Sequence, residues 1–336
     1  MNDSLNQTLN DSTAINPNIR YGLLSIKIIM IFSTVIMNFT ILNAILFKVK
    51  NKKYSYYLFL SIATGDLIVG TSSMSFMTIF TMFNYWPLGY SSCVFWVIVD
   101  YSTSTINLIN IMLLTIQRYL LIKYPYSTKE KLTKLKIMLI LSVWLICYSY
   151  WATSVLIITS VPDFDPLNCY FTYTFSYVLT SDLAAYGTPV VLITIFSILT
   201  MIELKKNRKS LTNNNSQTNK LKAKKSERAF LCILLVSTNI IAFWMVFIVC
   251  WPINAYCNGC LDVVLMEVSY WLAYLASTTN PIIVLTFNKT IRRKAFSIIR
   301  MLFCIKRRNA IINASISAIT GTGQTIPNQF KTESYS

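Results

Sequence analysis

Residues 22–53 read GLLSIKIIMIFSTVIMNFTILNAILFKVKNKK. From residue 22 to residue 47 this stretch is almost wholly apolar, and it exceeds the roughly 20 residues that a helix needs to cross a bilayer. A basic cluster follows it directly: Lys48, Lys50, Lys52 and Lys53. Further long apolar runs lie at 55–82, 93–116, 137–160, 173–202, 229–253 and 262–287. The sequence therefore predicts an all-α membrane protein, with a seven-transmembrane helix bundle over residues 22–287.

The composition excludes a soluble protein. Hydrophobic residues make up 54% of the chain and charged residues only 13%, whereas soluble domains carry roughly 25% charged residues. There is no histidine, which excludes Ser-His-Asp triads, histidine metal sites and imidazole acid–base catalysis. The eight cysteines are scattered except for one Cys-x-x-Cys pair, so a zinc site of thiolates is not indicated either. We therefore expect neither an enzyme nor a histidine or zinc site.

Basic residues alternate between the connections of the predicted bundle. The first, third and fifth connections and the segment after the last span are rich in Lys and Arg, whereas the second, fourth and sixth connections contain none. Because basic connections stay in the cytoplasm, we expect a multi-pass protein of the plasma membrane with its N-terminus outside and its C-terminus inside. The formal charge of +17 then faces anionic lipid and a cytosolic partner, not nucleic acid.

The N-terminal segment 1–21 is polar and precedes the first apolar run. Its three sequons predict an extracellular tail that is glycosylated at Asn2, Asn6 and Asn10. We expect no cleavable signal peptide, because the first apolar run begins late and is long enough to be a span itself.

The C-terminal segment divides in two. Over 288–304, basic and apolar residues alternate at helical spacing, which predicts a short amphipathic eighth helix lying at the membrane interface. Cys304 closes this segment and is either palmitoylated or a plain thiol. Residues 305–336 are polar, and we expect them to form a disordered cytoplasmic tail.

The carboxylates inside predicted spans include Asp66, Asp100 and Asp182. An ionisable group in a span is costly and by default marks a functional site. The alternative for each is that neighbouring hydroxyls or water satisfy it. For Asp66, in the middle of the second span, we favour a buried polar or sodium site that includes Asn107.

Asp100 lies about two turns inside the third span. Tyr101 and Ser104 follow it, and Tyr270 and Tyr274 lie one turn apart in the seventh span. A carboxylate ringed by aromatic side chains suits a cation, because it supplies the counter-charge while the ring faces add cation–π attraction. Aromatic residues at helical spacing are usually ordinary packing, but together with Asp100 they predict a site for a small cationic amine.

The order and spacing of marker residues resemble the rhodopsin-like G-protein-coupled receptors over most of the chain. The markers are Asn38, Asp66, Cys93, Cys169, Gln117-Arg118-Tyr119, Pro125, Trp144, Pro189 and Asn280-Pro281. No single marker is decisive, but in this order they are specific. The resemblance implies a disulfide between Cys93 and Cys169, coupling to a heterotrimeric G protein through Arg118, and an amine whose ammonium binds Asp100.

Several segments are similar to muscarinic acetylcholine receptors in particular. They are residues 85–89, Asp100-Tyr101 with Ser104 and Asn110, Trp151, the Cys257–Cys260 pair, and Tyr270-Trp271-Leu272 with Tyr274. This resemblance implies a second, short disulfide between Cys257 and Cys260, and acetylcholine as the ligand. The implied pocket consists of Asp100, Tyr101, Ser104, Trp151, Trp244, Tyr270 and Tyr274.

The sixth span departs from the family pattern and leaves two registers open. Trp251 and Pro252 look like the family's Cys-Trp-x-Pro segment with one residue missing, and they would place Asn254 against the ligand. Counting back from the Cys-x-x-Cys pair instead makes Trp244 the switch tryptophan, with Phe247 facing the ligand. We prefer Trp244, because it fits the chain length on both sides.

Residues that switch the family between its states are altered. Gln117 replaces an acid, and Ser197 and Val284 replace tyrosines, so a degenerate amine-binding receptor with weak signalling is one alternative. A histamine receptor that uses Asp182 as a second carboxylate is another. An opsin is excluded because residues 262–287 contain no lysine, and a transporter is disfavoured because the chain has only eight glycines and no visible repeat.

Overall fold

The computed structural model describes residues 17–50, 52–83, 85–124, 133–159, 169, 174–212, 217–257 and 259–301. The predicted glycosylation sites Asn2, Asn6 and Asn10, the predicted palmitoylation site Cys304 and the predicted tail 305–336 all lie outside the described residues.

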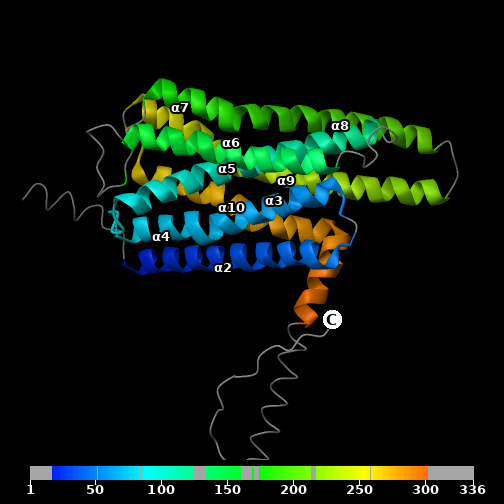
Figure 1. Cartoon of the computed structure of the whole chain (residues 1–336), viewed down its shortest axis with the longest axis horizontal. Helices are drawn as coiled ribbons and strands as arrows, with labels where there is room; N and C mark the ends of the chain where they lie inside the picture. The colour runs from blue at the N-terminus through cyan, green and yellow to red at the C-terminus, as the bar shows by residue number, and fades with distance from the viewer. Residues whose placement is uncertain are drawn as a thin grey trace, which may run out of the picture.

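Seven helical rods lie side by side in the described part of the chain (Figure 1). Five are continuous helices: α2 (Pro17–Lys48), α5 (Tyr90–Lys123), α6 (Thr133–Thr159), α9 (Gln217–Tyr256) and α10 (Val263–Phe287). Two contain a wide π-helical turn, labelled η: α3 (Tyr54–Ile68), η1 (Val69–Ser73) and α4 (Met74–Phe83), then α7 (Phe175–Asp182), η2 (Leu183–Gly187) and α8 (Thr188–Thr212). The predicted seven-helix bundle is confirmed.

Six rods of the described chain are long and apolar enough to cross a membrane. The seventh, α10, has 25 residues, more than the roughly 20 that a span needs. Its middle is more polar because it contains Ser277, Thr278 and Asn280, which are buried inside the bundle.

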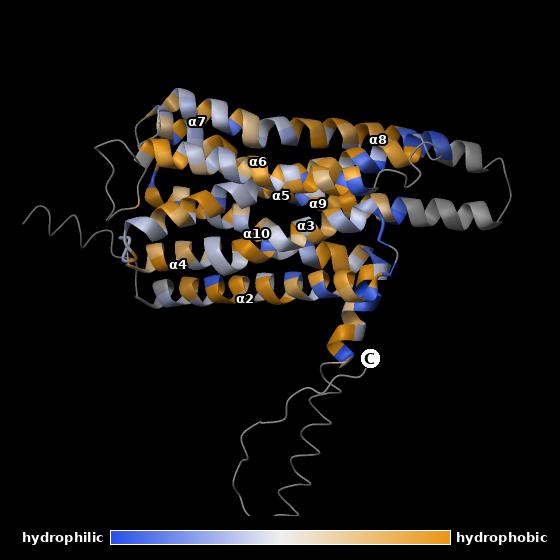
Figure 2. Cartoon of the chain, in the orientation of Figure 1, coloured by the Kyte–Doolittle hydropathy of each residue, from blue (hydrophilic) through white to orange (hydrophobic). Residues whose placement is uncertain are grey.

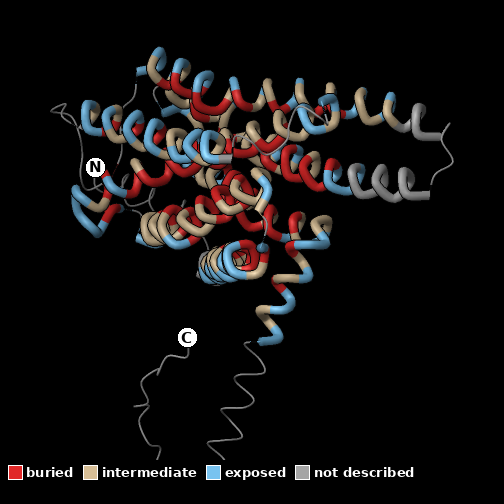
Figure 3. Tube along the Cα trace, turned by 45° about the vertical axis from the view of Figure 1, so that its right-hand side comes forward, coloured by how far each residue is buried: buried red, intermediate tan, exposed pale blue. Residues whose placement is uncertain are grey.

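The bundle is apolar on the outside, and its mainly hydrophobic interior also contains buried polar groups. Hydrophobic residues occur along most of the length of the rods (Figure 2), and large ones such as Phe32 and Leu145 are 64% and 70% exposed. Buried positions gather on the faces that meet inside the bundle (Figure 3), and they include hydroxyl, amide and carboxyl groups. This distribution suits lipid as the surrounding solvent, because polar residues in a membrane face the bundle interior.

The two ends of the bundle differ. One end, called the disulfide end below, carries the Cys93–Cys169 and Cys257–Cys260 disulfides. The opposite end, called the basic end, carries basic residues on several rods: Lys48, Lys123, Lys205, Lys206 and Arg228. After α10, residues 289–301 are helical and turn away from the bundle at the basic end (Figure 1).

The helix α5 lies at the centre of the bundle. It packs against α3, α6, α8 and α9, while α10 closes the bundle between α9 and α2. Buried side chains occur around much of the circumference of α5. A carboxylate on α5 is therefore enclosed on several sides, and this places Asp100 inside the bundle.

Candidate ligand-binding site

Asp100 is the central polar group at the disulfide end of the bundle interior. It is 6% exposed, and the hydroxyl of Tyr274 donates a hydrogen bond to its Oδ2 at 3.0 Å. The buried Ser73 hydroxyl of η1 lies beside the same carboxylate. Oδ1 of Asp100 is buried and has no partner at hydrogen-bonding geometry among the described residues. The carboxylate thus has capacity for a further donor.

A narrow cavity, with free room for about one water molecule, adjoins Asp100. Most of the side chains that line it are aromatic. The lining residues are Asp100, Tyr101, Ser104, Tyr186, Trp244, Phe247, Tyr270, Ala273 and Tyr274. The structure therefore brings together every predicted pocket residue except Trp151.

The aromatic rings around the cavity support one another. The Tyr101 and Tyr270 hydroxyls lie 3.5 Å apart, and the Phe247 and Tyr270 ring centroids 5.0 Å apart. Tyr186 stacks on Trp244 at 5.2 Å. Hydroxyls, ring faces and one carboxylate in an enclosed space are the groups that bind an ammonium.

Two residues of this region have positions that the sequence did not indicate. Trp151 is fully buried behind Tyr101, with ring centroids 4.9 Å apart, and its Nε1 donates to Thr105 Oγ1 at 3.0 Å. Trp151 therefore supports the lining residue Tyr101 from behind but does not line the cavity itself. Tyr186 does line the cavity; the available signal was an aromatic residue three positions before Pro189 in an apolar span.

The helix α9 presents Trp244, Phe247 and Trp251 on one face, since they are spaced by three and four residues. Trp244 lines the cavity and meets Phe247 edge to face at 5.7 Å. Trp251 stacks on Phe247 at 5.5 Å and lies 5.6 Å from Tyr101, nearer the disulfide end. The Asn254 side chain accepts a hydrogen bond from Leu261 N at 3.1 Å and so closes the connection to α10.

A second narrow cavity, with similarly little free room, lies deeper in the bundle around Asp66. Asn107 Nδ2 donates to Asp66 Oδ1 at 2.8 Å, and Asn280 Nδ2 donates to Oδ2 at 3.3 Å. Oδ1 of Asn107 is buried without a partner among the described residues. Residues that line both cavities form a shared wall: Ser104, Trp244, Ala273 and Tyr274.

Asp182, the third carboxylate, ends α7 and is 3% exposed. Its Oδ1 has no partner among the described residues. The neighbouring Ser181 hydroxyl lies 3.0 Å from the Tyr150 hydroxyl of α6. Asp182 is not among the residues that line the cavity beside Asp100.

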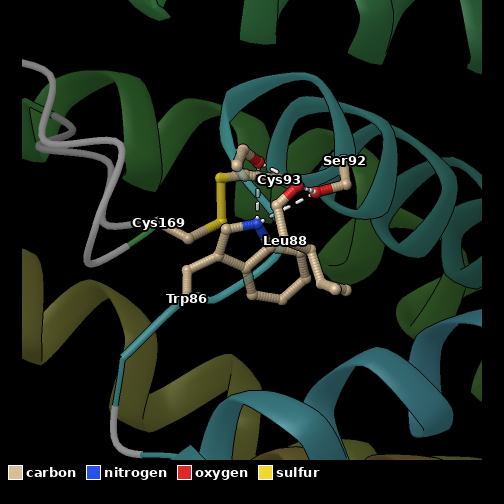
Figure 4. Close-up of a disulfide and its surroundings, with 6 residues drawn as sticks. Trp86, Leu88, Ser92, Cys93 and Cys169 are labelled. Atoms are coloured by element: carbon tan, nitrogen blue, oxygen red, sulfur yellow. Dashed lines mark hydrogen bonds between the residues drawn. A yellow bond between two sulfur atoms is a disulfide. The ribbon is translucent and has the colours of Figure 1, made fainter.

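The Cys93–Cys169 disulfide fixes residue 169 to the start of α5 (Figure 4). Next to it, Trp86 Nε1 donates to Gly89 O at 2.9 Å, and Ser92 Oγ donates to Leu88 O at 2.7 Å. Gly89 has a φ of 78°, a conformation that favours glycine. This braced turn holds the beginning of α5, about three turns before Asp100, in place.

Arg118 lies on α5 near the basic end and is partly buried. The residues that stand where the family has switch tyrosines are both buried: Ser197 is 7% exposed and Val284 5%. Between them and the cavities, the Thr115 and Ser237 hydroxyls lie 3.3 Å apart and link α5 to α9. The basic end therefore contains Arg118, but a serine and a valine are buried there at the two positions where the family has tyrosines.

Comparison with known proteins identifies a receptor family that covers most of the chain. A family described as "7 transmembrane receptor (rhodopsin family)" matches residues 37–283. Muscarinic acetylcholine receptor M2 from Gallus gallus is 31% identical over 173 residues, which are 48% of this chain and 36% of that receptor. Muscarinic acetylcholine receptor M5 from Rattus norvegicus is 27% identical over 241 residues, 68% of this chain and 45% of that receptor. In both cases the match spans less than half of the relative's length.

Proposed function

The chain belongs to the rhodopsin family of seven-transmembrane receptors, and on this basis we propose that it binds a small cationic amine, acetylcholine, and signals to a heterotrimeric G protein. It is a membrane receptor and not an enzyme. The observation that carries the proposal is the buried Asp100 carboxylate, one oxygen of which lacks a partner among the described residues, beside an aromatic cavity.

An ammonium ligand suits this site for an electrostatic reason. A carboxylate away from water is costly unless an opposite charge and hydrogen bonds compensate it. Tyr274 supplies one hydrogen bond to Asp100, and a ligand cation would supply the charge. Tyr101 and Tyr270 offer ring faces to a methylated ammonium, which has no N–H to donate.

Acetylcholine is favoured over histamine by two observations. The relatives reported above are muscarinic acetylcholine receptors by name. Asp182, which a histamine receptor of this design would use as a second carboxylate, lies outside the set of residues that line the cavity. Acetylcholine binding without activation of a G protein would instead identify a degenerate amine-binding receptor.

We further propose that the protein resides in the plasma membrane with the disulfide end outside and the basic end in the cytoplasm. Disulfides form in oxidising compartments, and Lys and Arg concentrate on the cytoplasmic side of membrane proteins. The ligand then enters at the disulfide end, and the G protein docks near Arg118 at the basic end.

The deeper cavity is proposed to hold a sodium ion. Asp66 supplies a carboxylate there, Asn107 an unpartnered amide oxygen, and Ser104 and Ser277 hydroxyls. Hard cations prefer oxygen ligands of this kind, so these residues fit the ion.

A G-protein dissociation assay in cells tests the proposal with acetylcholine, histamine and other biogenic amines as probes. We expect a response to acetylcholine that Asp100→Asn weakens by roughly 30-fold or more, because truncating one partner of a buried charge pair costs about 2–5 kcal/mol. Surface expression, measured in the same cells, should be unchanged. Asp182→Ala is the comparison variant: loss of a histamine response but not an acetylcholine response would overturn the choice of ligand, and an intact response in Asp100→Asn would overturn the ammonium site.

A further inference from the structure

An ion pair between Lys27 of α2 and Glu267 of α10 joins the first and last rods at the disulfide end. The Lys27 ammonium also donates to Thr81 Oγ1 of α4 at 2.9 Å and lies 5.1 Å from the centroid of the Trp271 ring. The side chains of Lys27 and Glu267 are 14% and 30% exposed. One ammonium therefore joins three rods through a carboxylate, a hydroxyl and a ring face.

The position of this pair matters because α2 and α10 are already joined deeper in the bundle. There the Thr34 and Thr278 hydroxyls lie 2.7 Å apart, and Asn38 Nδ2 donates to Ser277 O at 3.2 Å. These bonds already hold the two rods together. Charges inside a span are costly and by default mark a functional site, so a role beyond joining the rods is expected for the charged pair. The ion pair adds a constraint on α10 nearer the disulfide end than those deeper bonds.

The same part of α10 carries the aromatic residues of the ligand site. Glu267 precedes Tyr270 and Trp271 by one helical turn. Trp271 meets Tyr274 edge to face at 5.7 Å, and the Tyr274 hydroxyl bonds to Asp100. A continuous path of contacts thus runs from Lys27 through Trp271 and Tyr274 to Asp100.

We propose that Lys27 and Glu267 are positioning residues of the ligand site. Their ion pair sets the rotation and tilt of the disulfide end of α10, and in this way it holds Tyr270 and Tyr274 against Asp100. The inference rests on the proposed function in one respect, that the ligand of Asp100 is a cationic amine.

A positioning role and a purely electrostatic role predict opposite patterns. If the pair acted only through its field, loss of the Lys27 charge would strengthen the binding of a cation and loss of the Glu267 charge would weaken it. If the pair positions α10, either loss releases the helix and weakens binding. The sign of the change in two single variants therefore separates the two roles.

The binding test uses acetylcholine on membranes that contain the full-length receptor. We expect Lys27→Met and Glu267→Gln each to weaken affinity about tenfold, or about 1.4 kcal/mol, and Lys27→Arg and the exchanged variant Lys27→Glu/Glu267→Lys to recover most of it. Ser25→Ala is the matched control, since the exposed Ser25 hydroxyl bonds to Tyr21 O of its own helix, and it should leave affinity unchanged. Opposite shifts in the two single variants, or no shift in either, would overturn the proposal.

A second measurement needs no ligand and so separates this proposal from the proposed function. Nitroxide labels at the exposed positions Leu23→Cys and Val264→Cys report the distance between the disulfide ends of α2 and α10. The distance distribution should broaden in Lys27→Met and narrow again in Lys27→Arg. An unchanged distribution would refute the positioning role even if acetylcholine binds. A receptor that ignores acetylcholine but shows the broadening would instead refute only the choice of ligand.

Discussion

At the scale of single residues, the deeper cavity depends on the lack of a side chain at Gly65. Gly65 of α3 faces Asn107, and a Cβ at this position would lie 2.0 Å from Asn107 Oδ1. The Asn107 amide would then lose its place beside Asp66, to which it donates at 2.8 Å. The approach of α3 to α5 around Asp66 thus requires glycine.

We expect Gly65→Ala to lower the free energy of unfolding by about 1–3 kcal/mol, the usual cost of overpacking a filled interior. This loss should appear although alanine is the better helix former. The measurement is the thermal unfolding midpoint of the purified protein in detergent. Gly22→Ala is the control, because a Cβ there meets nothing within 4 Å, so its midpoint should be unchanged or higher. Equal midpoints for the two variants would show that Asn107 can move without cost.

At the scale of elements, α9 links the ligand site to the rest of the bundle through one face. Trp244 lies in the wall shared by the two cavities. Trp251 lies two turns nearer the disulfide end, against Tyr101. Trp244 therefore lines the ligand cavity, whereas Trp251 packs on the lining residues Tyr101 and Phe247, and the loss of each should have different consequences.

We expect Trp244→Ala to reduce maximal G-protein activation by acetylcholine severalfold, because the wall between the cavities is removed. Trp251→Ala should instead accelerate dissociation of the ligand about tenfold and leave maximal activation intact, because Tyr101 and Phe247, which line the cavity, lose a supporting ring. Activation in cells and dissociation kinetics on membranes measure the two effects. The reversed pattern would assign the switch to Trp251.

The sequence allowed the rods and much of the site to be predicted, because apolar length and residue spacing depend on local chemistry. Seven apolar runs gave the seven rods, and helical spacing placed Tyr270 and Tyr274 on one face. The link between Lys27 and Glu267 was not predicted, because the two residues are 240 positions apart and each alone reads as an isolated charge in a span. The wide turns η1 and η2 left no signal in the apolar pattern, and they determine where Ser73 and Tyr186 point.

At the scale of the whole molecule, the bundle contains two anionic sites on opposite sides of one wall. Asp100 and Asp66 each adjoin a cavity, and Tyr274 lines both of them. A cation in one cavity repels a cation in the other, and both bear on the same wall residues. The two sites are therefore expected to be coupled, and coupling between binding sites is reciprocal.

We expect acetylcholine to bind about fivefold more tightly, within the usual range of coupling free energies, when sodium in the buffer is replaced by N-methylglucamine at equal ionic strength. Asp66→Asn should abolish this dependence, because it removes the carboxylate of the deeper site. Equilibrium binding on membranes provides the measurement. A sodium dependence that persists in Asp66→Asn would place the ion elsewhere.

The ion pair between the first and last rods also has a consequence for synthesis. Lys27 enters the bilayer while most of the chain is still unmade, and its partner Glu267 follows 240 residues later. At roughly 5–20 residues per second, the lysine waits on the order of ten to fifty seconds for its counter-charge. A chain that stops before α10 keeps an unmatched ammonium in its first span, which costs about 3 kcal/mol near the centre of a bilayer and less toward the interface. Lys27 therefore distinguishes unfinished from finished chains: its ammonium has no carboxylate partner until Glu267 has been synthesised and is paired afterwards.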